Sequence, residues 1–377
     1  MGSDRASNPA SALGKLSLER QSVWLDYIHR TMLRNGELKA LIEARGVRGV
    51  TSNPTIFEQA IGKSDAYDDG IAAAQGKDTE AVFESIAIED IRAACDLFLP
   101  IYEMTGGNDG FVSMEVSPRL AHDTEGTLRD ARRLWQAIGR PNAMIKIPGT
   151  AEGLPAITAA LADGININVT LLFSVGMYER VIDAYLSGLE RRQAAGGSID
   201  NVRSVASFFV SRVDTETDKR LEALGKPAQT KPLMGTAAVA NAKLAYAAYV
   251  KHFEARRFRD LMAKGGAVQR PLWASTGTKN PDYKDTKYVD ELIGPDTVNT
   301  MPPATLEAFA DHGMVDRTVD RDVEQARRQV AAIEAAGVKL DDVTDFLVVD
   351  GVKKFADSYT SLLATVEQKR AKLAAVS

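Results

Sequence analysis

Eight short runs of β-forming residues, separated by helical segments, constrain the fold most strongly. The runs cover residues 22–26, 49–53, 111–116, 142–147, 165–170, 202–210, 271–275 and 297–301. Helix start and stop signals lie between several of them. Segment 123–139 opens on Asp-Thr and ends on Gly, segment 174–196 runs from a capping serine to Gly-Gly, and segment 236–265 is long and alanine-rich. This alternation over about 280 residues predicts an α/β fold, the (β/α)8 TIM barrel.

An open, doubly wound sheet is the strongest alternative fold. Such a sheet is expected to carry a glycine-rich phosphate turn after its first strand, and the chain has neither a GxGxxG nor a GxxxxGK[ST] motif. Nucleotide cofactors therefore have no support in the sequence. We expect no cofactor.

The chain organisation is consistent with one domain at residues 18–377, preceded by a flexible N-terminus at residues 1–17. Residues 303–377 form a helical C-terminal extension of the predicted barrel. Within it, segments 320–337 and 341–375 have the pattern of charged, amphipathic helices. Their charge runs are interpreted as solvated faces.

Composition narrows the functional classes. A hydrophobic fraction of 45% with 26% charged residues is ordinary for a globular protein, and a net charge of -5 argues against nucleic acid or an anionic membrane as a partner. The only cysteine, Cys95, permits no intrachain disulfide, and no apolar stretch approaches the roughly 20 residues that span a bilayer. We expect a cytoplasmic protein, as a monomer or a homodimer. The four scattered histidines favour no metal site.

Polar residues occupy one face of the predicted strands. In segment 165–170, Ile and Val alternate with Asn and Thr, and in a parallel sheet covered by helices the polar face should point into the barrel. Other strands carry a polar residue at or near their C-terminal ends, where barrel enzymes place catalytic groups. These residues are Asp26, Asn53, Glu115, Ser207 and Ser275.

Lys146 lies alone in the apolar run 143–148, on the same strand face as Met144. Burial disfavours the charged form of an ammonium that has no partner. A lysine that loses its proton readily can form a Schiff base with a carbonyl substrate. The alternative is a lysine that reaches solvent or a salt bridge at the end of a strand.

Three stretches resemble the transaldolase family. They are GVTSNPT at 49–55, IKIPGTAEGL at 145–154 and GININVTLLFS at 164–174, and the second contains the position of the family's Schiff-base lysine. The length and the helical tail are similar to the longer bacterial type. The resemblance implies transfer of a dihydroxyacetone unit between sugar phosphates, from fructose 6-phosphate or sedoheptulose 7-phosphate to erythrose 4-phosphate or glyceraldehyde 3-phosphate. This reaction belongs to the non-oxidative pentose phosphate pathway.

The resemblance also implies roles for individual residues. Lys146 would attack the ketose carbonyl, Asp26 would act as acid and base on the hydroxyl that becomes the leaving aldehyde, and Glu115 with Thr170 would hold a proton-shuttling water. Two alternatives stay open: Asp26 as a helix N-cap, and Glu115 as a partner that only keeps Lys146 charged. The dihydroxyacetone hydroxyls would be bound by Asn53, Asn168 and Ser207. Buried amides without a ligand would lack partners, which favours a polar ligand.

At the phosphate end, Arg212 resembles the family's phosphate-binding arginine and Ser275 its serine at the seventh strand. A second arginine is expected after that serine, but the sequence there is TGTKN at 276–280. Lys279 is the natural substitute, although it lacks the bidentate fork of arginine, and a solvated loop lysine is the alternative. Phe209 stands where the related fructose 6-phosphate aldolases have tyrosine. A phenyl ring cannot position water, which favours a transferase over a free aldolase.

Two other classes remain as competitors. A different Schiff-base lyase, such as a deoxyribose-phosphate aldolase, would lack the Asn-Pro motif and place its lysine elsewhere. A non-catalytic barrel would bind sugar phosphates without turning them over.

Overall fold

Eight parallel strands form a closed barrel in the computed structural model, which describes residues 11–74 and 76–376. Each strand pairs with its neighbours in chain order, and β1 pairs with β8 to close the barrel. The predicted (β/α)8 barrel is therefore confirmed. The strands are β1 (Gln21–Leu25), β2 (Gly49–Val50), β3 (Phe111–Glu115), β4 (Ala143–Pro148), β5 (Ile167–Leu172), β6 (Ser204–Phe209), β7 (Arg270–Ala274) and β8 (Thr297–Met301).

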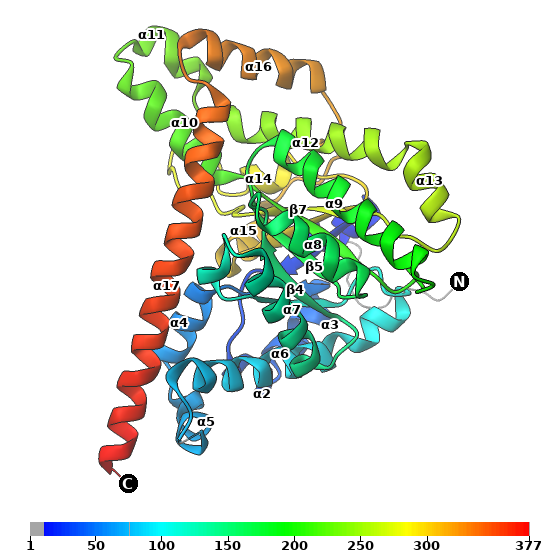
Figure 1. The fold of residues 1–377 in the computed structure, drawn as a ribbon. Helices are drawn as coiled ribbons and strands as arrows, with labels where there is room; N and C mark the ends of the chain where they lie inside the picture. The colour runs from blue at the N-terminus through cyan, green and yellow to red at the C-terminus, as the bar shows by residue number, and fades with distance from the viewer. Residues whose placement is uncertain (1–10, 75, 377) are drawn as a thin grey trace.

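Helices surround the barrel (Figure 1). No helix in the described part of the chain is long and apolar enough to span a membrane. Between the strands lie α2 (Arg30–Arg34), α3 (Glu37–Arg45), α4 (Pro54–Gly62), α5 (Asp68–Ala73), α6 (Thr79–Met104), α7 (Thr124–Ile138), α8 (Gly153–Ala162), α9 (Val175–Ala194), α10 (Ser211–Ala223), α11 (Pro227–Thr230), α12 (Ala237–Phe253), α13 (Arg256–Met262) and α14 (Lys287–Asp290).

Only β8 has its predicted bounds, and the other seven strands begin or end one to three residues from them. Two of these differences, in β2 and β5, lie next to the end of the barrel where the polar residues gather. β2 stops at Val50 because Asn53 already caps α4, accepting a hydrogen bond from the backbone N–H of Ile56, with Pro54 in the first turn. β5 begins and ends two residues later than predicted, and its register with β6 shifts between Val169 and Leu172. Within this bulge Leu171 has a left-handed backbone, with φ of 58°.

The long helix predicted at residues 236–265 is wrong as a single element. It is divided into α12 and α13, because Ala255 adopts an extended backbone and starts the second helix. The two helices pack together at this corner, where the rings of Phe253 and Phe258 are 4.8 Å apart. Alanine-rich composition predicted the helical content but not the break.

The expectation of a flexible N-terminus through residue 17 is wrong for the part that the structure describes. Residues Ala12–Leu18 form α1, whose first turn is capped by Ser11 through a hydrogen bond from Gly14 N–H. Leu13 and Leu16 are buried, so the helix is held by packing. The prediction for residues 1–10 lies outside the described residues.

Three helices follow β8, namely α15 (Pro303–His312), α16 (Val323–Ala336) and α17 (Leu340–Val376). The last two match the amphipathic segments expected from the sequence. The helix α17, orange to red in Figure 1, runs along one side of the barrel and packs against α4, α5, α6 and α10. Its buried residues recur at helical spacing, as Leu347, Gly351, Phe355, Tyr359, Leu362 and Val366. The C-terminal extension is therefore part of the packed core.

Candidate active site

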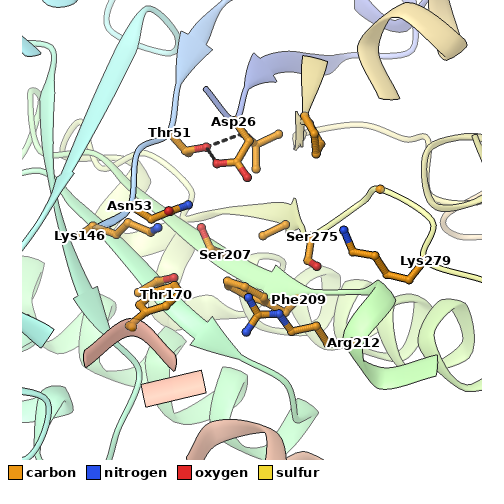
Figure 2. Close-up of a pocket in the computed structure, with 15 residues that line it drawn as sticks. Asp26, Thr51, Asn53, Lys146, Thr170, Ser207, Phe209, Arg212, Ser275 and Lys279 are labelled. Atoms are coloured by element: carbon orange, nitrogen blue, oxygen red, sulfur yellow. Dashed lines mark hydrogen bonds between the residues drawn. The ribbon is translucent and has the colours of Figure 1, made fainter. Parts of the chain in front are cut away.

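A polar pocket of about 190 Å³ opens at the C-terminal ends of the barrel strands. Of the eleven residues predicted to act in catalysis or binding, nine line it and two, Glu115 and Asn168, do not. Figure 2 labels these nine predicted residues together with Thr51, which was not predicted. The lining residues are Asp26, Thr51, Asn53, Lys146, Thr170, Ser207, Phe209, Arg212, Ala274, Ser275, Gly277, Lys279, Thr300, Pro302 and Phe355.

Lys146 reaches the pocket from β4 and is only 4% exposed. Its ammonium donates a hydrogen bond of 3.1 Å to the backbone carbonyl of Ser52 and lies 3.4 Å from a carboxylate oxygen of Glu115. The alternative in which this lysine reaches bulk solvent is therefore wrong, while a salt bridge does exist. The lysine faces the cavity, and the carboxylate beside it is a group that can take its proton.

Glu115 pairs directly with Lys146 in the register of β3 and β4, so the two side chains point to the same face of the sheet. Neither carboxylate oxygen of Glu115 has a hydrogen-bond partner. Burial raises the pKa of Glu115 to about 7, against the neighbouring charge of Lys146, which lowers it. A carboxyl group that titrates near neutral pH can both accept and return a proton.

Asp26 follows β1 and accepts a hydrogen bond of 2.6 Å from the hydroxyl of Thr51, drawn as a dashed line in Figure 2. The hydroxyl of Thr51 lies 2.7 Å from that of Thr300, so residues from β8 and from the turn after β2 hold the carboxylate. Burial raises the pKa of Asp26, although Lys146 and this hydrogen bond oppose the shift. The N-cap alternative for Asp26 is wrong, because His29 caps α2.

Asn168 is fully buried, and both ends of its amide have protein partners. Its nitrogen donates to the hydroxyl of Ser113 at 3.0 Å, and its oxygen accepts from Ser207 at 2.7 Å. Asn168 therefore needs no ligand to complete its hydrogen bonds, contrary to the expectation for buried amides. The same holds for the amide oxygen of Asn53, which caps α4. Substrate binding by these two residues stays a prediction.

Thr170 lies on the bulged end of β5, two residues along the strand from the register partner of Lys146. Its hydroxyl is buried without a hydrogen-bond partner, like the carboxylate of Glu115 and one terminal nitrogen of Arg212. Buried polar atoms without partners are uncommon in proteins. Two of these three groups lie near Lys146 and the third at the opposite end of the pocket, so a ligand or water can complete the hydrogen bonding at both ends.

Arg212, in the first turn of α10, forms the other end of the pocket. Its guanidinium lies 5.1 Å from the ring centroid of Phe209, and the two are seen stacked in Figure 2. Burial lowers the pKa of Arg212, with Asp350 and Asp26 acting in the opposite direction. A guanidinium held against a ring, with one nitrogen unpaired, can bind an anion.

The segment that follows β7 contributes Ser275 and Lys279 to the pocket, at the end where Arg212 lies. Ser275 has a left-handed backbone, with φ of 55°, and its hydroxyl is 2.9 Å from that of Ser211. This conformation costs a non-glycine residue about 1–3 kcal/mol and is typical of functional sites. Lys279 is exposed at the rim of the pocket with its ammonium directed inward (Figure 2).

Sequence reasoning missed the contributions of Thr51, Thr300 and Phe355. Thr51 and Thr300 are recognisable from strand alternation, since Thr51 alternates with Asn53 in its segment and Thr300 lies near the end of the eighth strand. Phe355 lies on α17, more than 200 residues away in sequence from Lys146. No local pattern places it in the pocket.

Fold and pocket together define a (β/α)8-barrel enzyme built around a buried lysine. The sequence model of the family described as Transaldolase/Fructose-6-phosphate aldolase matches residues 23–366. The chain therefore belongs to this family, and the resemblance seen in the three sequence motifs is confirmed.

Curated relatives named transaldolase match nearly the whole chain. The protein of Frankia alni is 50% identical over 366 residues, covering 96% of this chain and 98% of its own. That of Mycobacterium tuberculosis strain H37Rv is 51% identical over 362 residues, covering 95% and 96%. That of Mycolicibacterium paratuberculosis is 51% identical over 368 residues, covering 97% and 98%.

Proposed function

We propose that this chain transfers a dihydroxyacetone unit between sugar phosphates through a Schiff base on Lys146. In one direction, sedoheptulose 7-phosphate and glyceraldehyde 3-phosphate give erythrose 4-phosphate and fructose 6-phosphate, a reaction of the non-oxidative pentose phosphate pathway in the cytoplasm. The observation that carries the proposal is the buried ammonium of Lys146, 3.4 Å from Glu115 and in one pocket with Asp26 and Arg212.

The first step joins donor and enzyme. Lys146 must lose a proton before its nitrogen attacks the ketose carbonyl, and Glu115 is the acidic group beside it. The carbinolamine then loses water to give the iminium. To Thr170, whose hydroxyl has no protein partner, we assign the water that carries protons between Glu115 and the adduct.

The second step breaks a carbon-carbon bond. Asp26 takes the proton from the hydroxyl that becomes the aldehyde, and the electron pair of the broken bond passes into the iminium to form an enamine. The aldehyde product leaves and an acceptor aldehyde replaces it. The enamine carbon then attacks the acceptor, Asp26 returns its proton, and hydrolysis releases the new ketose from Lys146.

A comparison of products with and without acceptor tests the function. The purified protein, given fructose 6-phosphate and erythrose 4-phosphate, should form sedoheptulose 7-phosphate and glyceraldehyde 3-phosphate. With fructose 6-phosphate alone, free dihydroxyacetone should be a minor product, in keeping with Phe209 in the pocket. Rapid release of dihydroxyacetone without acceptor would indicate an aldolase. No product in either reaction and no adduct on reduction would indicate a binding protein.

Arg212→Ala should raise the Michaelis constant for phosphorylated donors by roughly one to two powers of ten, because a charge-assisted hydrogen bond contributes about 1.5–3 kcal/mol. Unphosphorylated fructose or dihydroxyacetone should be little affected. Lys279→Ala is the matched variant and should have a smaller effect in the same direction. Steady-state kinetics with both substrate types check this. Equal weakening of both types would make Arg212 a structural residue, and no effect at Lys279 would return it to the solvated loop.

The pH profile of kcat/KM should rise through pH 7 if Glu115 accepts the proton from Lys146. With the pKa of Glu115 near 7, the ionised fraction grows about tenfold between pH 6 and pH 8, and the rate should follow it. Glu115→Gln cannot ionise, so its activity should be low and should lack this limb. An unchanged limb in Glu115→Gln would assign the titration to another group and leave Glu115 as a charge partner of Lys146.

A further inference from the structure

The helix α17 supplies one wall of the pocket through Phe355. This side chain is 5% exposed, and its ring centroid lies 5.6 Å from the ammonium nitrogen of Lys146. The nearby pocket residues from the barrel, such as Thr170 and Ser207, carry hydroxyl groups. An apolar ring in this position can neither bind nor orient water, so it keeps water from the side of Lys146 that it covers.

Contacts on either side of Phe355 fix the position of α17. One turn earlier, Gly351 lies so close to the bulged end of β5 that an added Cβ would be 3.0 Å from a methyl carbon of Leu171. One turn later, the hydroxyl of Tyr359 donates a hydrogen bond of 2.6 Å to Glu80 at the start of α6. The spacing of four residues puts all three positions on one face of the helix. The ring is therefore held in place by its own helix.

The other phenyl ring of the pocket, that of Phe209, contacts Arg212 and not Lys146. Phe209 lies under the guanidinium of Arg212 at 5.1 Å and packs against Phe173 at 5.2 Å. Phe355 is the aromatic residue in contact distance of the Lys146 ammonium within the described chain. The two rings consequently serve opposite ends of the pocket.

We propose that Phe355 determines reaction specificity by shielding the covalent intermediate on Lys146 from water. This inference rests on the proposed function. The enamine formed after bond cleavage has two fates. It can attack an aldehyde to form a new carbon-carbon bond, or its carbon can take a proton, after which water adds to the iminium and releases dihydroxyacetone. Because Phe355 covers one side of the adduct next to Lys146, it keeps water from that side and slows protonation of the enamine carbon, and the intermediate persists until an acceptor aldehyde arrives.

The test measures the ratio of dihydroxyacetone release to transfer for Phe355→Ala, Phe355→Leu and Phe346→Ala. Phe355→Ala removes the ring from the pocket wall and should raise the ratio of release to transfer at least about tenfold. Leucine keeps an apolar wall and should stay near the wild-type ratio. Phe346 lies on the same helix but is 43% exposed, so its alanine variant controls for changes in α17.

The possible results distinguish failure of the role proposed for Phe355 from failure of the proposed transaldolase function. A proportional loss of transfer and release in Phe355→Ala, with an unchanged ratio, overturns the inference, as does a leucine variant that releases dihydroxyacetone as freely as the alanine variant. If Phe355→Ala does not fold, Phe355→Tyr should raise the ratio by admitting a hydroxyl, and an unchanged ratio there overturns the inference too. Wild-type protein without transfer or borohydride trapping would instead refute the proposed function.

Discussion

Lys146→Met is expected to abolish turnover while the protein stays folded. The substitution removes the nucleophile and puts a side chain of similar length into an apolar strand. Loss of a covalent nucleophile typically costs roughly six orders of magnitude in kcat. Burial raises the pKa of Glu115 to about 7 even beside Lys146, whose charge lowers it. Without that charge Glu115 stays protonated at neutral pH, so no unpaired charge is left in the barrel.

Borohydride reduction in the presence of fructose 6-phosphate locates the nucleophile. The mass of the reduced adduct should appear on a peptide that contains Lys146 in wild-type protein and be absent from Lys146→Met. Lys279→Met is the matched control, since it removes the exposed lysine at the pocket rim, and its adduct should still form at Lys146. Circular dichroism and thermal melting establish that each variant is folded. An adduct on another lysine would disprove the assignment.

Asp26→Asn should lower kcat by about 10²–10⁴-fold, the usual contribution of a general acid or base. Asparagine has the same shape and its oxygen can still accept the hydrogen bond from Thr51, so the fold should be little changed. Imine formation comes before the step that needs Asp26. The variant should therefore be trapped by borohydride as readily as wild-type protein, while aldehyde release is slow in single-turnover measurements.

Thr51→Val is the control variant for the hydrogen bond that holds the Asp26 carboxylate in position. It keeps the carboxylate but removes the hydrogen bond that favours its ionised form. The pKa of Asp26 should rise further, and the loss of activity should be smaller than in Asp26→Asn and recover at higher pH. A near-normal rate for Asp26→Asn would leave that carboxylate a structural role only, held between the segments after β1 and β2.

Local pattern was enough to predict the barrel, because several strands alternate polar and apolar residues and helices such as α7 and α9 begin at their own capping side chains. The same alternation pointed Lys146, Thr170 and Ser207 into one space. What it could not predict depends on neighbours distant in the chain. Asn168 finds partners on β3 and β6, which satisfy its amide without a ligand. Phe355 enters the site on α17, which approaches β5 closely at Gly351.

The docking of α17 has a consequence for how the site is completed during synthesis. The pairing of β8 with β1 closes the barrel, and Lys146, Glu115 and Asp26 all precede β8 in the chain. Phe355 is translated more than fifty residues after β8 ends, at some 5–20 residues per second. Every strand of the barrel is therefore synthesised before the helix that walls the pocket. The residues proposed to carry out the chemistry are thus synthesised before the residue proposed to control the fate of the intermediate.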